Sequence, residues 1–216
     1  MAAHKLSSAV SEPSLHRYGS VESTQKIAAG LPIGSVVLAD EQTAGRGRLD
    51  RHWEAPPGTG LLVTYVLQPR RLIVFAAGVA AAEACGPDVR LKWPNDLVLD
   101  DRKLGGVLAE LKAGRALVGI GINLTWSPPG AAQLNADREL VLADLSRLLP
   151  TWALAPDDEI LAAWRERSWT LGQTVRVELD GETFEGLAED IDADGALIVD
   201  GRRVIAGDVV RLRPTS

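Results

Sequence analysis

Apolar and polar positions divide residues 1–171 into short strands mixed with a few helices. Short β-rich apolar runs predict strands at Ser35–Asp40, Leu61–Gln68, Val89–Trp93, Asp96–Leu99, Lys103–Leu111 and Ala116–Leu124. Helical spacing, bounded by capping residues and glycines, predicts helices at Ser20–Gly30, Arg71–Cys85, Arg138–Leu149 and Asp157–Ser168. Because the two kinds of element are intermixed, we expect a mixed body of helices and strands.

The pattern changes after Leu171-Gly172, where only short strands and turns remain. The predicted strands are Val175–Leu179, Thr183–Glu189, Ala196–Val199, Arg203–Ile205 and Val209–Leu212. The turns between them include Asp180-Gly181 and Asp194-Gly195, and Asp-Gly pairs favour tight hairpins. Residues 172–216 are therefore predicted to form a second domain, a small antiparallel β-barrel.

Composition and charge narrow the range of functions. The chain of 216 residues carries a net charge of −6, which argues against the basic face that sequence-independent binding of nucleic acid requires. No apolar run is long enough to cross a membrane, and the first ten residues contain no apolar signal core. The single cysteine excludes an internal disulfide. We expect a cytoplasmic protein that binds neither membrane nor nucleic acid.

Residues 45–53, Gly-Arg-Gly-Arg-Leu-Asp-Arg-His-Trp, place three arginines beside two glycines in an otherwise acidic chain. Glycine permits positive φ and lets backbone N–H groups turn toward one point. Arginine offers planar donor forks that suit phosphate or carboxylate oxygens. The loop alone leaves two interpretations equally open, an anion-binding loop or a solvated basic turn.

Four further segments carry polar groups at strand or helix ends. Ser23 and Thr24 stand at a predicted helix start, where they are either simple caps or donors to a ligand. Gln42 ends a predicted strand, where its amide would face a pocket. In Lys92-Trp93-Pro94-Asn95-Asp96, Pro94 ends a strand in a rigid corner whose side chains are hard to explain as core filling. Asn123 ends the apolar strand Gly119–Asn123, otherwise typical of a packed core.

Four motifs follow one another along the chain: the arginine-containing loop, Lys92–Asp96, Lys103-Leu104-Gly105-Gly106-Val107-Leu108-Ala109-Glu110, and Gly119–Asn123. In order and spacing they resemble a biotin–protein ligase over roughly residues 18–213. The resemblance implies an α+β fold, with a mixed-sheet catalytic domain related to class II aminoacyl-tRNA synthetases over residues 1–171 and a small SH3-like β-barrel over residues 172–216. The mixed body and β-rich tail expected from the sequence pattern are compatible with that fold.

The resemblance also implies a two-step reaction. Biotin's carboxylate attacks the α-phosphate of ATP, giving biotinyl-5′-AMP and pyrophosphate. The biotinyl group then passes to a lysine amine of a biotin carboxyl carrier domain of an acyl-CoA carboxylase. Mg²⁺ would enter with the phosphates of ATP and needs only one or two protein ligands, which the sequence leaves unidentified.

Site residues follow from the same resemblance, position by position. The expected catalytic residues are Lys92, between the biotin carboxylate and the α-phosphate, together with Arg48 and Arg46. The expected biotin-binding residues are Ser23, Thr24, Gln42, Gly45, Arg46, Arg48 and Lys92. The expected ATP- or adenylate-binding residues are Gly47, Arg51, Trp53, Asn95 and Asn123. We further expect residues 45–53 to be mobile without ligand and ordered over the intermediate.

The chain departs from the family pattern in three places. Asp50 stands where the loop usually has a second glycine, and its carboxylate can pair with Arg48 or Arg51. Gln25 replaces the usual asparagine and is therefore not assigned to the site. About 17 residues precede the matching region, too few for the DNA-binding domain of many family members. We expect the monofunctional form, as a monomer or weak homodimer.

Two other functions remain as alternatives. A lipoate or octanoate–protein ligase or transferase shares the fold, but such transferases use a cysteine nucleophile, and Cys85 lies in an alanine-rich helix where a core position is expected. A non-catalytic module that binds biotin or its adenylate would not require so many cations. ATP–pyrophosphate exchange that depends on biotin distinguishes an enzyme from such a module.

Overall fold

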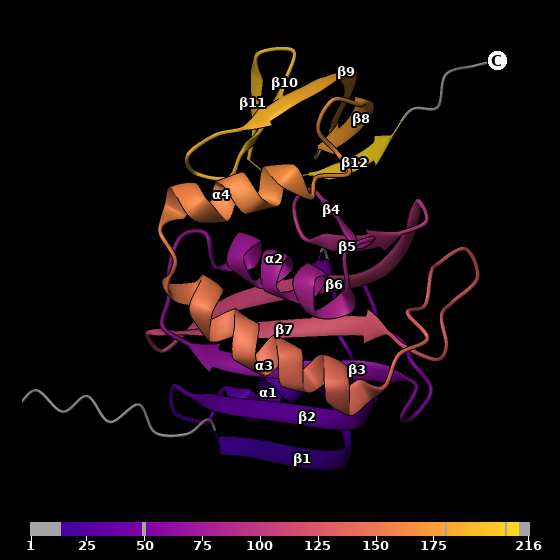
Figure 1. The fold of residues 1–216 in the computed structure, drawn as a ribbon, viewed down its shortest axis with the longest axis vertical. Helices are drawn as coiled ribbons and strands as arrows, with labels where there is room; N and C mark the ends of the chain where they lie inside the picture. The colour runs from indigo at the N-terminus through magenta and orange to yellow at the C-terminus, as the bar shows by residue number, and fades with distance from the viewer. Residues whose placement is uncertain (1–13, 49–50, 180, 206, 212–216) are drawn as a thin grey trace, which may run out of the picture.

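The computed structural model describes residues 14–48, 51–179, 181–205 and 207–211, and its largest element is a mixed seven-stranded sheet (Figure 1). The strands are β1 (Ser14–Val21), β2 (Ser35–Gln42), β3 (Gly60–Leu67), β4 (Arg90–Lys92), β5 (Asp96–Leu99), β6 (Arg102–Lys112) and β7 (Arg115–Asn123). They lie in the order β1-β2-β3-β7-β6-β5-β4. Only the β1–β2 pair is parallel, so the predicted mixed sheet is confirmed.

Helices cover both faces of this sheet. They are α1 (Thr24–Ala28), α2 (Ile73–Cys85), α3 (Arg138–Leu154) and α4 (Asp157–Glu166). Side chains alternate across a strand, so Val37 of β2 is buried beside α1, whereas Val36 and Leu38 belong to the larger core on the other face. Helices α2 and α3 lie in front of the sheet in Figure 1 and close that core, while α4 lies against the C-terminal strands.

Residues 172–211 form a smaller antiparallel unit, called the C-terminal unit below. Its strands are β8 (Thr174–Leu179), β9 (Glu182–Ile191), β10 (Leu197–Val199), β11 (Arg202–Val204) and β12 (Asp208–Arg211), in the order β11-β10-β9-β8-β12. The α+β class with an antiparallel C-terminal sheet is confirmed. Within the described residues the strands pair in an open row, so closure into a barrel stays a prediction.

Trp93 links the part of the chain that carries the seven-stranded sheet to the C-terminal unit. Its side chain is 1% exposed, and its indole N–H donates to the carbonyl of Gly195 at 2.9 Å. Its backbone N–H donates to Thr170 Oγ1 at 2.9 Å. The expectation that this tryptophan is not core filling is therefore wrong, because the Pro94 corner turns the indole inward, onto the junction of the two parts.

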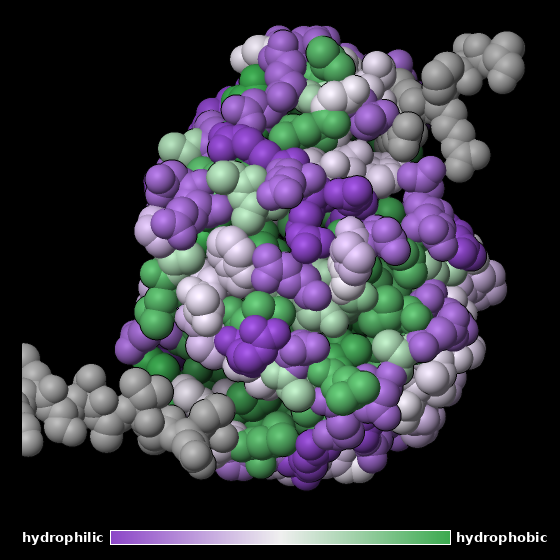
Figure 2. Space-filling model, in the orientation of Figure 1, coloured by the Kyte–Doolittle hydropathy of each residue, from purple (hydrophilic) through white to green (hydrophobic). Residues whose placement is uncertain are grey.

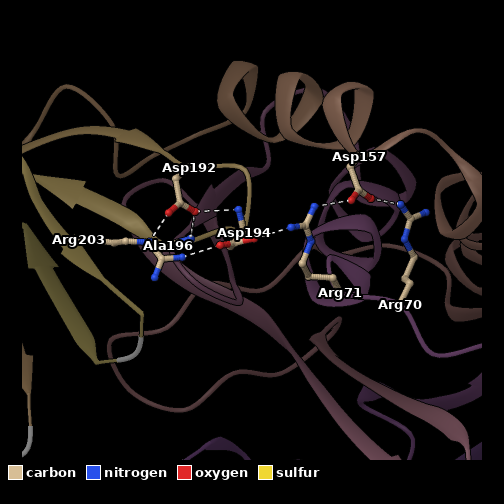
Figure 3. Close-up of polar contacts among 7 residues, drawn as sticks. All are labelled: Arg70, Arg71, Asp157, Asp192, Asp194, Ala196 and Arg203. Atoms are coloured by element: carbon tan, nitrogen blue, oxygen red, sulfur yellow. Dashed lines mark hydrogen bonds and ion pairs between the residues drawn. The ribbon is translucent and has the colours of Figure 1, made fainter.

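At the surface of this junction, arginine and aspartate side chains alternate (Figure 3). Arg71 pairs with Asp157 at 2.8 Å and with Asp194, and Arg203 pairs with Asp194 at 2.8 Å and with Asp192. The guanidinium of Arg71 lowers the pKa of Asp157. Hydrophilic residues gather in the same region in Figure 2, around α4 and the C-terminal unit. Exposed pairs of this kind contribute little each, about 0–1 kcal/mol, so they orient the unit more than they stabilise it.

Two predicted helices have different bounds in the structure. The helix expected at Ser20–Gly30 is shorter in the structure: its first residues belong to the end of β1, and α1 covers only Thr24–Ala28. Ser23 is the N-cap residue, but its side chain forms no capping hydrogen bond. Helix α3 continues past Pro150 to Leu154, because tertiary contacts hold its last turn. Trp152 donates to Glu83 of α2 at 3.0 Å, and Arg70 donates to the carbonyl of Ala153 at 2.8 Å. None of the helices described is long and apolar enough to cross a membrane.

Candidate active site

The main cavity lies between the arginine-containing loop, the β4–β5 corner, the end of β7 and the C-terminal unit. Its volume is about 540 Å³, a size typical of small-molecule sites. Eight of the expected site residues line it: Arg46, Gly47, Arg48, Arg51, Trp53, Lys92, Asn95 and Asn123. These residues come from three segments that lie far apart in the sequence, and the fold brings them together.

Lys92 is the last residue of β4, in register with Asp96 on β5. Burial lowers the pKa of its ammonium group, and Lys103 and Arg51 lower it further, while the carboxylate of Asp96 opposes the shift. Its Nζ lies 5.9 Å from the ring centroid of Trp169. A partly buried cation among other cations is poorly compensated by the protein, which favours an anionic ligand beside it.

Arg48 is the second cation held inside this cavity. It donates from Nη1 to Asn95 Oδ1 at 3.2 Å, and Asn95 in turn donates from Nδ2 to the carbonyl of Val107 at 2.8 Å. Burial lowers the pKa of Arg48. Among the residues that the structure describes, neither Arg48 nor Lys92 forms an ion pair. Asn95 therefore orients Arg48 without neutralising its charge.

The other two loop arginines are neutralised by distant carboxylates. Arg46 pairs with Glu110 of β6 at 2.9 Å, and Arg51 pairs with Asp208 of β12. Asp50, the acid expected to pair within the loop, lies outside the described residues, as does its neighbour Leu49. Arg48 is therefore available to an anionic ligand. Arg46 and Arg51 would first have to leave their carboxylate partners.

The loop glycines provide close approach rather than unusual backbone angles. Neither Gly45 nor Gly47 has a positive φ, so that part of the prediction is wrong. A Cβ at Gly45 would lie 2.4 Å from the carbonyl oxygen of Trp53, which explains why no side chain fits there. The N–H of Gly47 donates to the carbonyl of Arg51 at 2.7 Å and closes the loop on itself. Gly45 lines neither the main cavity nor the small cavity beside Ser23 and Thr24.

A small cavity of about 30 Å³, called the inner cavity below, shares Arg46, Trp53, Leu108 and Gly119 with the main one. Ser23, Thr24 and Gln42 line it, as their positions at element ends predicted. Gln42 Oε1 accepts from the N–H of Thr24 at 2.7 Å and from its Oγ1 at 3.0 Å. Thr24 Oγ1 also lies 2.8 Å from Thr64 Oγ1. The result is a buried polar wall behind the main cavity.

Comparison with known proteins shows which family the chain belongs to. The model of the biotin/lipoate A/B protein ligase family matches residues 20–126, and that of the biotin protein ligase C-terminal domain matches residues 170–212. The biotin–[acetyl-CoA-carboxylase] ligase of Mycobacterium tuberculosis is 36% identical over 222 residues, covering 87% of this chain and 83% of that protein. The Paracoccus denitrificans ligase of the same name is 34% identical, covering 82% and 88%. The chain belongs to the biotin protein ligase family.

Solved structures of biotin protein ligases agree with the fold. The Aquifex aeolicus biotin protein ligase in complex with biotin and ATP superposes with a TM-score of 0.83 at 25% identity, covering 92% of this chain and 99% of that one. The Helicobacter pylori biotin acetyl coenzyme A carboxylase synthetase, at a TM-score of 0.73 and 23% identity, supports the fold alone. The predicted family, fold and ligase class are thereby confirmed.

Sequence reasoning missed several residues that line the cavities of this ligase. Gln25 donates to the carbonyls of Leu108 and Leu117 at 2.9 and 3.3 Å, joining α1 to β6 and β7 beside the inner cavity. Thr64, a polar residue in the apolar strand β3, also lines that cavity. In the main cavity, Lys103 pairs with Asp96 at 2.8 Å. No group of three His, Cys, Asp or Glu within the described ranges could hold a metal, so Mg²⁺ ligands stay unassigned.

Proposed function

We propose that this ligase activates biotin with ATP to biotinyl-5′-AMP and transfers the biotinyl group to a lysine of a biotin carboxyl carrier domain. The observation that carries the proposal is the pair formed by Lys92 and Arg48, two partly buried cations in one cavity without a carboxylate partner among the described residues. Such a pair suits a reaction in which two anions have to meet.

The charges determine what these residues do in the first step. A carboxylate oxygen of biotin attacks the α-phosphorus of ATP, and the bond to pyrophosphate breaks. At 4 Å two unit charges repel by about 4 kcal/mol at an effective dielectric of 20. Lys92 and Arg48 offset that repulsion, and most strongly where charge develops in the transition state. Asn95 keeps Arg48 directed into the cavity, in addition to its expected contact with the adenylate.

The remaining site residues are assigned to binding. Ser23, Thr24 and Gln42 hold the polar ureido head of biotin, because buried donors and acceptors discriminate against ligands that lack matching groups. Asn123, 3% exposed at the end of β7, faces the adenylate.

The loop completes the site around both substrates. Arg46 and Arg51 exchange their carboxylate partners for substrate oxygens, and Trp53 covers the adenylate. Gly45 and Gly47 let the loop approach closely. Mg²⁺ bound to ATP neutralises phosphate charge when it is present.

In the second step, the uncharged amine of the acceptor lysine attacks the acyl carbon and AMP leaves with the former carboxylate oxygen. The relatives from M. tuberculosis and P. denitrificans are named for acetyl-CoA carboxylase, so the carrier domain of such a carboxylase is the proposed partner. We place the domain boundary between residues 171 and 172, at the start of the C-terminal unit.

A lipoate or octanoate enzyme of the same fold is the alternative. A transferase of that kind would need a reactive thiol, but burial raises the pKa of Cys85 to about 12, and Cys85 lines neither cavity. A module that only binds biotin or its adenylate is the other alternative. Lys92 and Arg48, which form no ion pair among the described residues, argue against it.

The experiment is ATP–pyrophosphate exchange with the full chain and MgATP, run with biotin, with lipoate and with neither. We expect exchange only with biotin, followed by a mass gain of one biotinyl group on an added carrier domain. Exchange supported by lipoate alone would establish the alternative enzyme. Biotin binding without exchange would instead establish the binding module.

A further inference from the structure

Residues 167–170, which lead from α4 into the C-terminal unit, lie along the free edge of β4. The N–H of Leu91 donates to the carbonyl of Arg167, and the N–H of Trp169 donates to the carbonyl of Leu91, each at 2.8 Å. Because β4 is the last strand of its sheet, these two bonds give it a partner on the side that the sheet leaves open. The segment is thereby fixed beside Lys92, the residue that follows Leu91.

The indole of Trp169 is anchored at its far end as well. Its Nε1–H donates to Asp101 Oδ1 at 2.6 Å, and Asp101 lies in the turn between β5 and β6. On the backbone side, Ser168 Oγ accepts from the N–H groups of Thr170 and Leu171 at 3.1 and 3.0 Å, which fixes the turn of the segment at this point. Held at both ends, the ring has a defined position beside the strand.

The ring of Trp169 faces the ammonium group of Lys92. Nζ lies over the indole at 5.9 Å from the ring centroid, within the range of cation–π attraction. Asp96, the carboxylate in register with Lys92 on β5, pairs with Lys103 at 2.8 Å instead. The indole therefore supplies an attraction that no carboxylate supplies as an ion pair among the residues that the structure describes.

An aromatic ring suits this position better than a carboxylate would. A lysine has a flexible side chain that loses rotamer freedom when its ammonium group is held against substrate oxygens. An ion pair would restrict the side chain but would also cancel the charge that the reaction needs. The face of an aromatic ring attracts the cation without neutralising it, so Lys92 is placed in advance and keeps its charge.

We propose that Trp169 is a positioning residue for Lys92, and that its indole holds the ammonium group where the biotin carboxylate and the α-phosphate meet. The inference rests on the proposed function, which assigns Lys92 to that point. Trp169 does not line the main cavity, so it acts through Lys92 and not by contact with a substrate. The rate of adenylate formation should therefore depend on the ring only while Lys92 is present.

The test is a double-mutant cycle on the full chain, measured as biotin-dependent ATP–pyrophosphate exchange at saturating biotin and MgATP. Trp169→Leu removes the aromatic face and should lower the rate about three- to tenfold. Trp169→Phe keeps an aromatic face and should retain roughly half or more of the wild-type rate. In the Lys92→Met background, Trp169→Leu should cause no further loss, because the cation that the ring holds is already gone.

Trp152→Leu is the matched control, because it removes an indole from α3, where Trp152 donates to Glu83 and does not line the main cavity. It should leave the rate unchanged in both backgrounds. A wild-type rate in Trp169→Leu, a Trp169→Phe as slow as Trp169→Leu, or an equal further loss in the Lys92→Met background would overturn the positioning role and leave the proposed function intact. A wild type without biotin-dependent exchange would overturn both.

Discussion

Arg51 of the active-site loop forms an ion pair with Asp208 at the start of β12, so the C-terminal unit reaches the loop that is proposed to bind ATP. Both residues line the main cavity. The side chain of Arg51 is 60% exposed and that of Asp208 is 29% exposed, so the pair is worth at most about 1 kcal/mol. A triphosphate carries more charge than one carboxylate, and we infer that ATP competes with Asp208 for this guanidinium.

Replacing Asp208 by asparagine should therefore favour ATP. With the competing carboxylate removed, we expect the KM for MgATP to fall by up to about fivefold, as the loss of an interaction of about 1 kcal/mol implies. The KM for biotin should not change. The measurement is ATP–pyrophosphate exchange at low and high salt, and the difference should shrink at high salt because exposed pairs are screened.

Asp200→Asn is a suitable control in the same unit, since Asp200 accepts from the N–H of Leu187 and does not line the main cavity. A higher KM for MgATP in Asp208→Asn would show that Asp208 holds Arg51 in the position that ATP needs. In that case the carboxylate assists ATP binding instead of competing with it.

Lys92→Met should separate activity from stability. Loss of the cation should lower the rate of adenylate formation by about 10²–10³-fold, the range found when one group that stabilises transition-state charge is removed. The methionine side chain fills similar space without a buried charge, so the melting temperature should stay equal or rise. A variant that melts well below the wild type would mean that Lys92 is needed for folding.

The lowered pKa of Lys92 also sets a pH dependence. Activity needs the charged form, so the alkaline limb of adenylate formation should begin below the pH at which an exposed lysine, with a pKa of about 10.4, loses its proton. In that window the unfolded chain holds more protons than the folded one, so folding stability should rise with pH. Comparison of wild-type and Lys92→Met unfolding curves across the alkaline range isolates this contribution.

The cations of the site could be predicted from the sequence, but their partners could not. Glycines beside arginines indicated an anion site, and Pro94 indicated that the strand carrying Lys92 ends in a corner there, although the structure ends it at Lys92 and not at Trp93. Glu110 lies 64 residues after Arg46, and no local pattern relates the two. Only the pairing of β6 and β7 against the loop makes them neighbours, and that contact decides which arginines are available.

Prediction from the local sequence pattern also failed where contacts distant in the sequence decide the structure. Strand β1 has mostly exposed side chains and pairs only with β2 at the sheet edge, so it lacks the apolar alternation that reveals a strand. Gln25 looked like a mere departure from the family pattern, yet its longer amide reaches carbonyls of two strands. Both features depend on where the sheet lies.

Trp93→Phe should weaken the junction between the catalytic body and the C-terminal unit. The carbonyl of Gly195 would lose its buried donor, which costs about 1–3 kcal/mol of unfolding free energy. Urea denaturation measures this loss. Trp126→Phe, in the loop that follows β7, should change stability by less. Equal losses in the two variants would mean that the bond to Gly195 contributes nothing specific.

Cys85→Ser should leave the reaction unchanged. Burial raises the pKa of the Cys85 thiol to about 12, so almost none of it is thiolate at neutral pH, and alkylating reagents should modify the native protein slowly until the pH approaches that value. Biotin-dependent pyrophosphate exchange and transfer to the carrier should both stay within about twofold of the wild type, because Cys85 lines neither the main cavity nor the inner cavity and serine is close to cysteine in size. Lys92→Met, assayed in parallel, should show its loss of about 10²–10³-fold in adenylate formation. The contrary outcome has two parts: Cys85→Ser forms the adenylate normally but loses transfer, and the wild type accumulates an acyl group on the thiol. That outcome would mean that the ligase acts through a covalent enzyme intermediate, and that the carrier lysine does not attack the adenylate directly.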